Sequence, residues 1–452
     1  MEKLLLQKEN SEMDVLSVEL TATWKIKCWR LLSKLENTYK KENITYYKEI
    51  KTMMEFKMIM KDFKEMTTRI IKAVPKKASI AILQKVLVMT ENNYVYFIAT
   101  DTEQELRVYK NVTVVENGKF CIDLDVLKKV SKLKANLITI KYDTEEQKMI
   151  VNTGKKTVTF YDNSDPENFP LMDYENAESF YSSTYNDFTD MMERLSLYNA
   201  RKDNTNPLMN AYSFNAEKNR VIALDGHRIA YRTVQNGFNP DSSIREINID
   251  RLFYEKLKPC LKEGKKDLHA IFINTCKSEN GKCDKIVIGG NEFYMIVRIS
   301  ETKYWDIDRM ILKEFDTNIA TFNRNELSEI SKYNVSLMTD NKEPMAICFD
   351  ENDTYSYMNN GKEESFDEFS MTENKAVKSG FMIGFNPSYL VDMCSSIDMD
   401  DLKLGFINAK SPMMAYGNEY TILILPVMIK NGEATVKESI SKLSNKSLVK
   451  TA

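Results

Sequence analysis

The sequence predicts an α+β protein made of three similar repeats, because three features return along it in the same order. A hairpin-like pattern and a capped helix each occur three times, and a buried strand that ends on aspartate occurs twice. Copies of one feature are separated by about 120 to 135 residues, which is the length of a domain. We therefore expect three domains, each with two helices packed on antiparallel sheets.

The first repeated feature is a β-hairpin. In each copy a short apolar strand reaches a glycine, and a second strand follows directly. Two apolar runs separated by a short glycine-containing turn are typical of antiparallel hairpins. The three copies lie at 149–160, 286–299 and 413–425, with their turns at Gly154, Gly290 and Gly417.

The second feature is an amphipathic helix that begins at an aspartate or asparagine. Such residues accept hydrogen bonds from the unpaired N–H groups of a first helical turn. The starting residues are Asp123, Asp250 and Asn386, and Asn386 is followed by Pro387, a residue favoured at the first helical position. We expect helices at 123–133, 250–257 and 386–393.

The third feature is a buried strand that ends on aspartate, at Phe97–Asp101 and Val221–Asp225. A longer helix is expected before each strand, at 62–74 and 186–202, and the matching helix of the third repeat at 323–333. The third strand, near Ala346–Phe349, lacks the motif. Chance similarity between α+β segments is the alternative explanation, but three features in matching order favour a true repeat. The expected domains are 56–176, 177–312 and 313–430.

The two ends of the chain fit none of these repeats. Residues 1–55 contain neither glycine nor proline and hold Trp24 and Trp29. We expect this N-terminal extension either to be helical, over Trp24–Leu35, or not to be part of the working protein, with translation beginning at Met53 or Met54. Residues 431–452 are rich in Lys, Ser, Glu and Asn, which predicts a polar tail that is disordered or weakly helical.

The composition is that of a soluble protein, with 43% hydrophobic and 29% charged residues. The net charge of −3 argues against a broad basic surface, although basic residues can still gather on one face. The sequence has no apolar run of membrane-spanning length, and its first residues lack a signal-peptide pattern. We expect a cytoplasmic protein with no membrane partner.

Residues that could carry chemistry are few. The seven cysteines are odd in number and irregularly spaced, which argues against a disulfide framework. Cys276 and Cys283 are the only close pair, and no second pair or nearby histidine completes a zinc site. Phosphate-binding loops, nucleophile elbows and paired metal carboxylates are missing, and Asp101 and Asp225 recur at the repeat spacing, as turn residues would. We expect no enzyme activity, no metal and no cofactor.

Several segments resemble one protein family. Ala223–Ala230, with the sequence Ala-Leu-Asp-Gly-His-Arg-Ile-Ala, is similar to a segment in the middle domain of bacterial beta sliding clamps, the processivity subunits (subunit beta) of DNA polymerase III. Gly384–Asp392 resembles the opening of that family's last helix, and Leu423–Ile429 its C-terminal strand. Weaker matches at 82–83, 98–101 and 169–173 are collinear with these, so the resemblance runs from about residue 56 to residue 429.

The resemblance implies a DNA clamp fold and a head-to-tail homodimeric ring. Such a ring encircles double-stranded DNA and tethers the replicative, DNA-directed DNA polymerase during DNA replication, without catalysis of its own. A divergent clamp of phage or plasmid type with specialised partners is an alternative. A structural scaffold that never touches DNA is another.

A clamp that slides needs weak attraction to phosphates without sequence preference. The expected helices of the first repeat, which include Arg69, carry more Lys and Arg than Asp and Glu, whereas the helix at 386–401 is acidic. Solvated lysines on ordinary helix faces are the alternative explanation. By resemblance, the candidate DNA contacts are Lys76, Lys77, Arg201 and Lys202.

The resemblance also implies a pocket that takes a short peptide from the polymerase or the clamp loader. An apolar groove with a few polar groups suits such a role, and flexible methionines suit several partners. His227 could instead be a structural histidine beside a turn, and Leu423–Met428 plain core. Trp305 stands where the family often has proline, and the residues after Lys430 could crowd the pocket. The matching positions are Met209, Leu224, Gly226, His227, Arg228, Ile229, Trp305, Arg309, Met310, Tyr389, Leu423, Leu425, Pro426, Val427 and Met428.

Overall fold

The computed structural model describes residues 53–448 except 201–205, 263–268, 279–280, 301, 314–317, 341–342, 351–352 and 430–431. Apart from residues 53–55, the predicted N-terminal extension therefore lies outside the described residues. The chain forms two compact units. The first comprises the described residues up to Thr67 with Lys85–Phe97 and Tyr109–Phe169; the second comprises Thr68–Gln84, Ile98–Val108 and the described residues from Pro170 onward.

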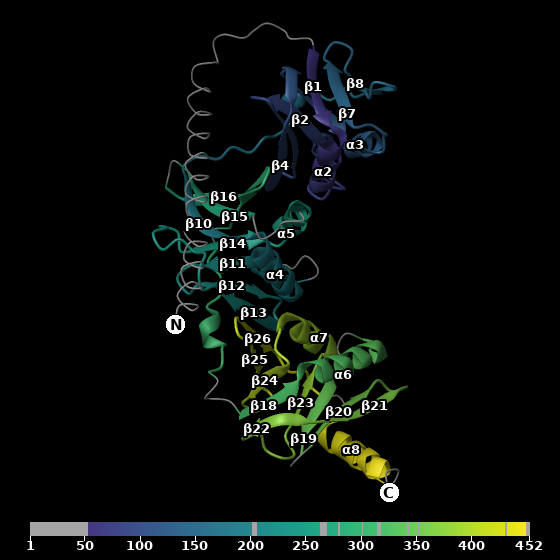
Figure 1. Cartoon of the computed structure of the whole chain (residues 1–452). Helices are drawn as coiled ribbons and strands as arrows, with labels where there is room; N and C mark the ends of the chain where they lie inside the picture. The colour runs from purple at the N-terminus through teal and green to yellow at the C-terminus, as the bar shows by residue number, and fades with distance from the viewer. Residues whose placement is uncertain are drawn as a thin grey trace, which may run out of the picture. The chain divides into compact units, whose positions relative to one another are not determined.

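Within the described residues, a strand, a helix and three strands follow one another six times (Figure 1). Two of these five-element groups make up each repeat. The first repeat is β1 (Met53–Ile59), α2 (Met60–Ile70), β2 (Lys85–Glu91), β3 (Tyr94–Thr100), β4 (Gln104–Asn111), then β6 (Lys119–Asp123), α3 (Leu124–Ser131), β7 (Leu137–Asp143), β8 (Lys148–Asn152), β9 (Thr157–Tyr161). The second is β10 (Ala177–Thr184), α4 (Tyr185–Leu195), β11 (Ala211–Asn215), β12 (Arg220–Leu224), β13 (Arg228–Thr233), then β14 (Glu246–Asp250), α5 (Leu252–Leu257), β15 (Ala270–Lys277), β16 (Cys283–Gly290), β17 (Phe293–Arg298). The third is β18 (Asn318–Asn323), α6 (Arg324–Leu337), β19 (Met345–Phe349), β20 (Thr354–Asn359), β21 (Glu364–Phe369), then β23 (Met382–Phe385), α7 (Pro387–Ser396), β24 (Asp401–Phe406), β25 (Met413–Tyr416), β26 (Tyr420–Ile424). The strands β5 (Thr113–Glu116) and β22 (Met371–Lys375) and the helix α8 (Glu433–Leu448) are additional.

The first unit contains a five-stranded sheet with the order β5-β1-β7-β8-β9. In β1 the alternate residues Met54, Phe56 and Met58 are buried, as expected of a strand with one face on the core. The strand begins at Met53, so three residues that we assigned to the N-terminal extension belong to this sheet. Strand β9 is an edge strand, and it pairs with β8 alone among the described residues.

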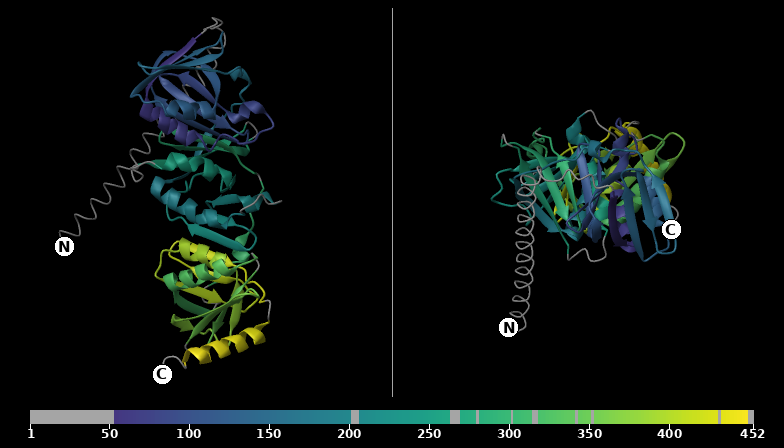
Figure 2. Two further views of the ribbon diagram at one scale, coloured as in Figure 1. Left: turned by 90° about the vertical axis from the view of Figure 1, so that its right-hand side faces the viewer. Right: turned by 90° about the horizontal axis from the view of Figure 1, so that it is seen from above.

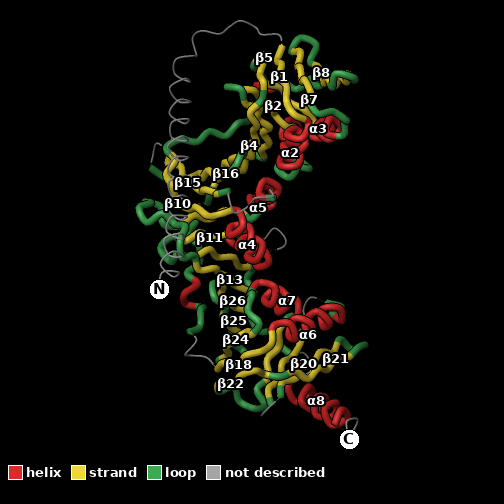
Figure 3. The backbone as a smooth tube through the Cα atoms, viewed as in Figure 1, coloured by secondary structure: helices red, strands yellow, loops and turns green. Residues whose placement is uncertain are grey.

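In the second unit, strand β13 pairs with β26 and so joins the second repeat to the third in one sheet. The sheet has the order β14-β11-β12-β13-β26-β25-β24-β18-β22, and a four-stranded sheet has the order β21-β20-β19-β23. Strand β17 pairs with residues 104–108 of β4. Figures 2 and 3 show the helices α6 and α7 side by side against the strands of the third repeat.

The predicted helix starts differ in how they are capped. The Asn386 side chain accepts a hydrogen bond from the backbone N–H of Ser388 at 2.9 Å, with Pro387 at the first position of α7. Asp250 accepts from the N–H of Leu252 at 2.9 Å. Asp123 precedes α3 but makes no side-chain capping bond. The sequence therefore located all three helices, but a side-chain capping bond forms only at Asn386, because the N-cap residue of α5 is Arg251, which makes none.

The polar tail was expected to be either disordered or weakly helical. Its described residues form α8, a helix of 16 residues, which agrees with the helical alternative. Val436 and Ile440 are four residues apart, so they share one helix face, and both are buried. An apolar stripe of this kind faces the core while the opposite face of the helix stays polar.

Candidate functional site

Five of the predicted pocket residues belong to one apolar cluster in the second unit. Met209, Leu224, Ile229, Trp305 and Leu423 come from a short helix before β11, from β12, β13 and β26, and from the segment after β17. The sequence analysis missed several members, although Ile222 could have been found because it shares a strand face with Leu224. The apolar cluster consists of buried Leu208, Ile222, Leu224, Ile229, Tyr304, Ile307, Met414 and Leu423, with Met209, Tyr231, Trp305, Ile311, Leu312 and Tyr416 packed against it.

The turn between β12 and β13 is held by Asp225. Its carboxylate Oδ1 accepts hydrogen bonds from the N–H groups of His227 at 3.0 Å and Arg228 at 2.9 Å. Gly226 lies at the tip with a φ of +86°, in the left-handed region that favours glycine. A Cβ on Gly226 would lie 3.3 Å from Cε of Met209, so this turn also approaches the apolar cluster.

Replacing Gly226 with alanine is expected to lower the free energy of unfolding by about 1 to 3 kcal/mol, because an L side chain is strained at this φ. Gly289 is a matched control, since it has no positive φ and a Cβ there meets nothing within 4 Å. Urea unfolding of both variants measures the difference. Equal losses for Gly226→Ala and Gly289→Ala would contradict the role of the turn.

Arg228 is a buried anchor under this turn, with an exposed fraction of 2%. Its guanidinium donates to Oδ2 of Asp225 at 2.9 Å, to Oδ2 of Asp392 at 2.6 Å and to the backbone oxygen of Leu197 at 2.7 Å. It also lies 4.2 Å from the ring centre of Tyr389. Burial lowers the pKa of Arg228, but the two carboxylates raise it by more, so the group stays charged. Arg228 therefore joins β13 to α7 rather than facing solvent.

His227 and the chain after β26 form the exposed part of the site. The His227 ring is exposed and stacks on Tyr389, with ring centres 6.3 Å apart and an angle of 26° between the planes. The backbone oxygen of His227 accepts from the N–H of Leu425 at 2.9 Å. Leu423 is buried core, as the alternative interpretation had it, whereas Leu425 is 37% exposed and Met428 is 88% exposed. Pro426 and Val427 are half-buried between them.

Arg309 and Met310 do not join the apolar cluster. Arg309 is exposed and pairs with Asp306 at 3.4 Å, and Met310 is also exposed. Within the described residues, their short helix contributes Ile307 to the cluster instead. In this segment the residue that packs in the cluster is Ile307, two positions before Arg309.

The candidate DNA contacts are only partly described. Lys76 and Lys77 are exposed in the loop that follows α2, whereas Arg201 and Lys202 lie outside the described residues. Arg69, which we counted among the basic residues of the first helix, is buried and donates to the backbone oxygen of Asn291 at 3.2 Å. Arg69 therefore contributes to packing and not to a basic surface.

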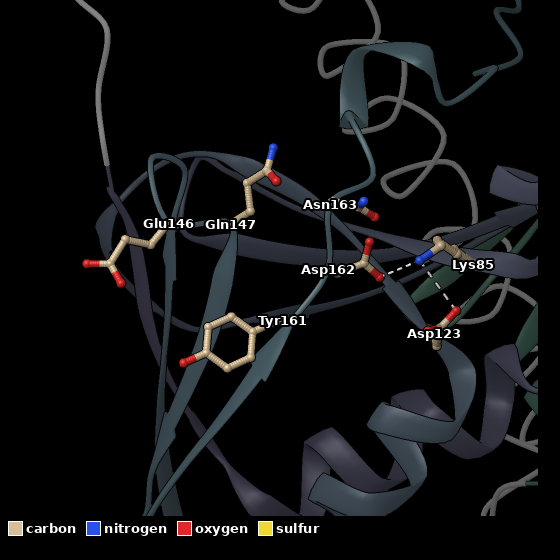
Figure 4. Close-up of a pocket in the computed structure, with 7 residues that line it drawn as sticks. All are labelled: Lys85, Asp123, Glu146, Gln147, Tyr161, Asp162 and Asn163. Carbon is tan, nitrogen blue, oxygen red and sulfur yellow. Dashed lines mark hydrogen bonds and ion pairs between the residues drawn. The ribbon is translucent and has the colours of Figure 1, made fainter.

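A polar cavity of about 470 Å³ lies in the first unit, and none of the predicted site residues lines it (Figure 4). Lys85 Nζ lies in it, 2.5 Å from Oδ2 of Asp162 and 3.5 Å from Oδ1 of Asp123. Burial lowers the pKa of Lys85, but these carboxylates raise it by more, so Lys85 stays protonated. A protonated, paired lysine is not a nucleophile. The cavity is lined by Lys85, Asp123, Glu146, Gln147, Tyr161, Asp162 and Asn163.

The described residues hold no group of three or more His, Cys, Asp and Glu side chains that could bind a metal ion. Burial raises the pKa of the Cys276 thiol to about 12 and that of Cys283 to about 11, which disfavours the thiolate form that metals bind. No helix in the described ranges is long and apolar enough to span a membrane.

Comparisons with known proteins identify one group of relatives, although no family model matches the sequence. The "Beta sliding clamp" of Staphylococcus epidermidis is 19% identical over 394 residues, covering 83% of this chain and 99% of the relative. A putative DNA polymerase III beta subunit from Eubacterium rectale has a TM-score of 0.74 at 22% identity, covering 83% and 99% of the two chains. A Pseudomonas aeruginosa sliding clamp bound to griselimycin has a TM-score of 0.72 at 18% identity, covering 83% and 100%. The chain thus has the beta sliding clamp fold and is similar in sequence to bacterial beta sliding clamps over nearly their whole length.

Proposed function

We propose that the protein is a DNA sliding clamp, a homodimeric ring that encircles duplex DNA in the cytoplasm and tethers the replicative polymerase for processive synthesis. The observation that carries this proposal is the match in fold and sequence to beta sliding clamps over nearly their whole length. A role in holding DNA topologically requires no catalytic group. The comparisons do not favour the alternative of a phage- or plasmid-type clamp, since the relatives are clamps of bacteria.

Two open sheet edges support closure of a ring by two copies. Strand β9 ends one sheet beside the exposed residues Lys155 and Lys156. Strand β21 ends another, and its exposed residues include Glu364 and Glu368. Unpaired strand edges offer N–H and C=O groups to another strand, and opposite charges set the register. The β9 edge of one copy and the β21 edge of the other form a head-to-tail contact, which closes when it occurs twice.

The apolar cluster and the exposed residues beside it are proposed to bind a short peptide of the polymerase or the clamp loader. Trp305 and Met209 at the rim of the cluster supply apolar contacts, while His227, Leu425 and Met428 are accessible. A mostly apolar surface with few polar groups suits a peptide anchored by apolar side chains. Arg309 and Met310 are proposed only as its outer border.

Retention on circular DNA is the prediction that tests the function. The protein, loaded onto nicked circular DNA by the clamp loader of the same genome, is expected to stay bound at high salt, because a topological link needs no phosphate contacts. It is expected to dissociate when the circle is cut once. Gel filtration of labelled protein and DNA before and after cutting measures this. Equal retention on circular and linear DNA would show ordinary binding and overturn the clamp proposal.

A further inference from the structure

Helix α8 packs on the four-stranded sheet of the third repeat, across strand β20 (Figures 1 and 2). Its buried residues Val436 and Ile440, with half-buried Leu443, lie on one helix face at spacings of four and three residues. They belong to a second apolar cluster, which we call the α8 cluster: Ala346, Cys348, Tyr357, Met382, Val436 and Ile440, with Tyr355, Phe366, Ile429 and Leu443 packed against it.

The sheet under α8 is built to be covered on both faces. Every residue of β19 and of β23 is buried. Successive side chains of a strand point to opposite faces, so Ala346 and Cys348 face one way and Met345, Ile347 and Phe349 the other. Ala346 and Cys348 belong to the α8 cluster, so α8 is the element that covers their face.

The chain between β26 and α8 passes through the proposed peptide site. We call Leu425–Ile429 the C-terminal wall. It is tied by the hydrogen bond from Leu425 N–H to His227, and by one from Val427 N–H to the oxygen of Gly384 at 2.8 Å. A Cβ on Gly384 would lie 2.5 Å from the oxygen of Val427, so only glycine permits this approach.

The far end of the C-terminal wall contacts the cluster to which α8 contributes. The Ile429 side chain packs against the α8 cluster. Gly432, with a φ of +73°, turns the chain into the helix, where its oxygen accepts from the N–H of Val436 at 3.3 Å. The C-terminal wall is therefore fixed at both ends, by β26 on one side and by the docked helix on the other.

We propose that α8 is a clasp that holds the C-terminal wall in the conformation that receives a partner peptide, with Val436 and Ile440 as positioning residues. This inference rests on the proposed peptide site. With α8 docked, the wall is ordered before binding, so the peptide does not have to order it. With α8 detached, Leu425–Ile429 is a polar-flanked chain end held by few contacts.

The first test needs no ligand. Val436→Asp and Ile440→Asp bury a charge under α8, and Ser441→Asp adds the same charge at an exposed position of the same helix. Amide exchange at Val427 is expected to be about tenfold or more faster in the two buried variants, while exchange in β24–β26 stays slow. The Ser441→Asp and conservative Ile440→Val variants are expected to match the wild type. Unchanged exchange at Val427 in both buried variants overturns the clasp.

A chemical readout checks the same event. Burial raises the pKa of the Cys348 thiol to about 11, which keeps it protonated beneath α8. Detachment of the helix exposes this thiol and lowers its pKa towards the ordinary value. Alkylation of Cys348 by iodoacetamide, followed by mass spectrometry, is therefore expected to be faster in Val436→Asp and Ile440→Asp only. If Cys348 were alkylated as fast in the Ser441→Asp control as in the two buried variants, detachment of α8 could not be the cause of the faster reaction.

The second test measures binding. The probes are griselimycin, the compound bound in the P. aeruginosa structure, and peptides tiled over the polymerase and clamp-loader subunits of the same genome. For a probe that binds the wild type, Ile440→Asp is expected to weaken affinity about tenfold, mainly through faster dissociation, with recovery in Ile440→Val. Faster exchange at Val427 with unchanged affinity overturns the positioning role. Failure of all probes to bind the wild type counts against the peptide site itself, whereas Val427 exchange and Cys348 alkylation still decide whether α8 is a clasp.

Discussion

Replacing Arg228 with methionine is expected to lower the free energy of unfolding of the second unit by about 3 to 5 kcal/mol, the cost of breaking a buried ion pair from one side. The side chains of Asp225 and Asp392 are only 12% and 14% exposed, so they would lose their partner without gaining full hydration. The contact between the guanidinium and the Tyr389 ring at 4.2 Å is lost as well. Urea unfolding followed by circular dichroism measures the change.

A matched control separates this effect from loss of any cation. Lys375 forms an ion pair with Glu373 at 3.2 Å, but its side chain is 66% exposed. Because water screens such a pair, Lys375→Met is expected to change stability by less than about 1 kcal/mol. The double variant Arg228→Met with Asp392→Leu is expected to recover part of the loss, since one unpaired carboxylate is removed with its partner. No recovery would show that Arg228 stabilises the unit through Asp225 and Tyr389 instead.

The sequence predicted most of the repeated elements because their signals are local. The hairpin around Gly290 and the helix start at Asn386-Pro387 each depend on a few neighbouring residues, and both formed where expected. The same is true of the Asp225-Gly226 turn, whose geometry requires those two residue types. Beta sliding clamp relatives agree with the α+β fold that these local signals indicated.

Features that depend on distant partners could not be read from the sequence. The sequence suggested that Arg69 is an exposed cation, because its hydrogen-bond acceptor, the backbone oxygen of Asn291, is distant in the sequence. Ile307 lies in a helix of three residues, which is too short to show a periodic pattern, so nothing local marked it as part of the apolar cluster. The burial of Val436 and Ile440 could not be predicted from the polar composition of residues 431–452, because it depends on the sheet against which they pack. Tertiary contacts decided all three outcomes.

Reversing the charges at one sheet edge is expected to dissociate the homodimer. Glu364→Lys with Glu368→Lys would place like charges on β21 opposite Lys155 and Lys156 of a second copy. Both glutamates are exposed and lie on one face of the strand, but Glu364 also accepts a hydrogen bond from the Tyr357 hydroxyl at 2.6 Å, so circular dichroism of the variant is the control that shows the single chain still folds. Like charges across an interface cost several kcal/mol in total, so dimerisation is expected to weaken by about 100-fold or more. Sedimentation velocity over a concentration series measures it.

The complementary variant makes this test specific to a head-to-tail ring. Lys155→Glu with Lys156→Glu gives a copy in which both edges are acidic, and it should be monomeric for the same reason. Mixing the basic-edged and acidic-edged variants should then yield a heterodimer, because each β9 edge meets a β21 edge of opposite charge in both contacts. An isologous contact between two β9 edges would give a different result: the Glu364/Glu368 variant would remain dimeric. Heterodimer formation only on mixing would therefore establish both the pairing of the edges and the closure of the ring.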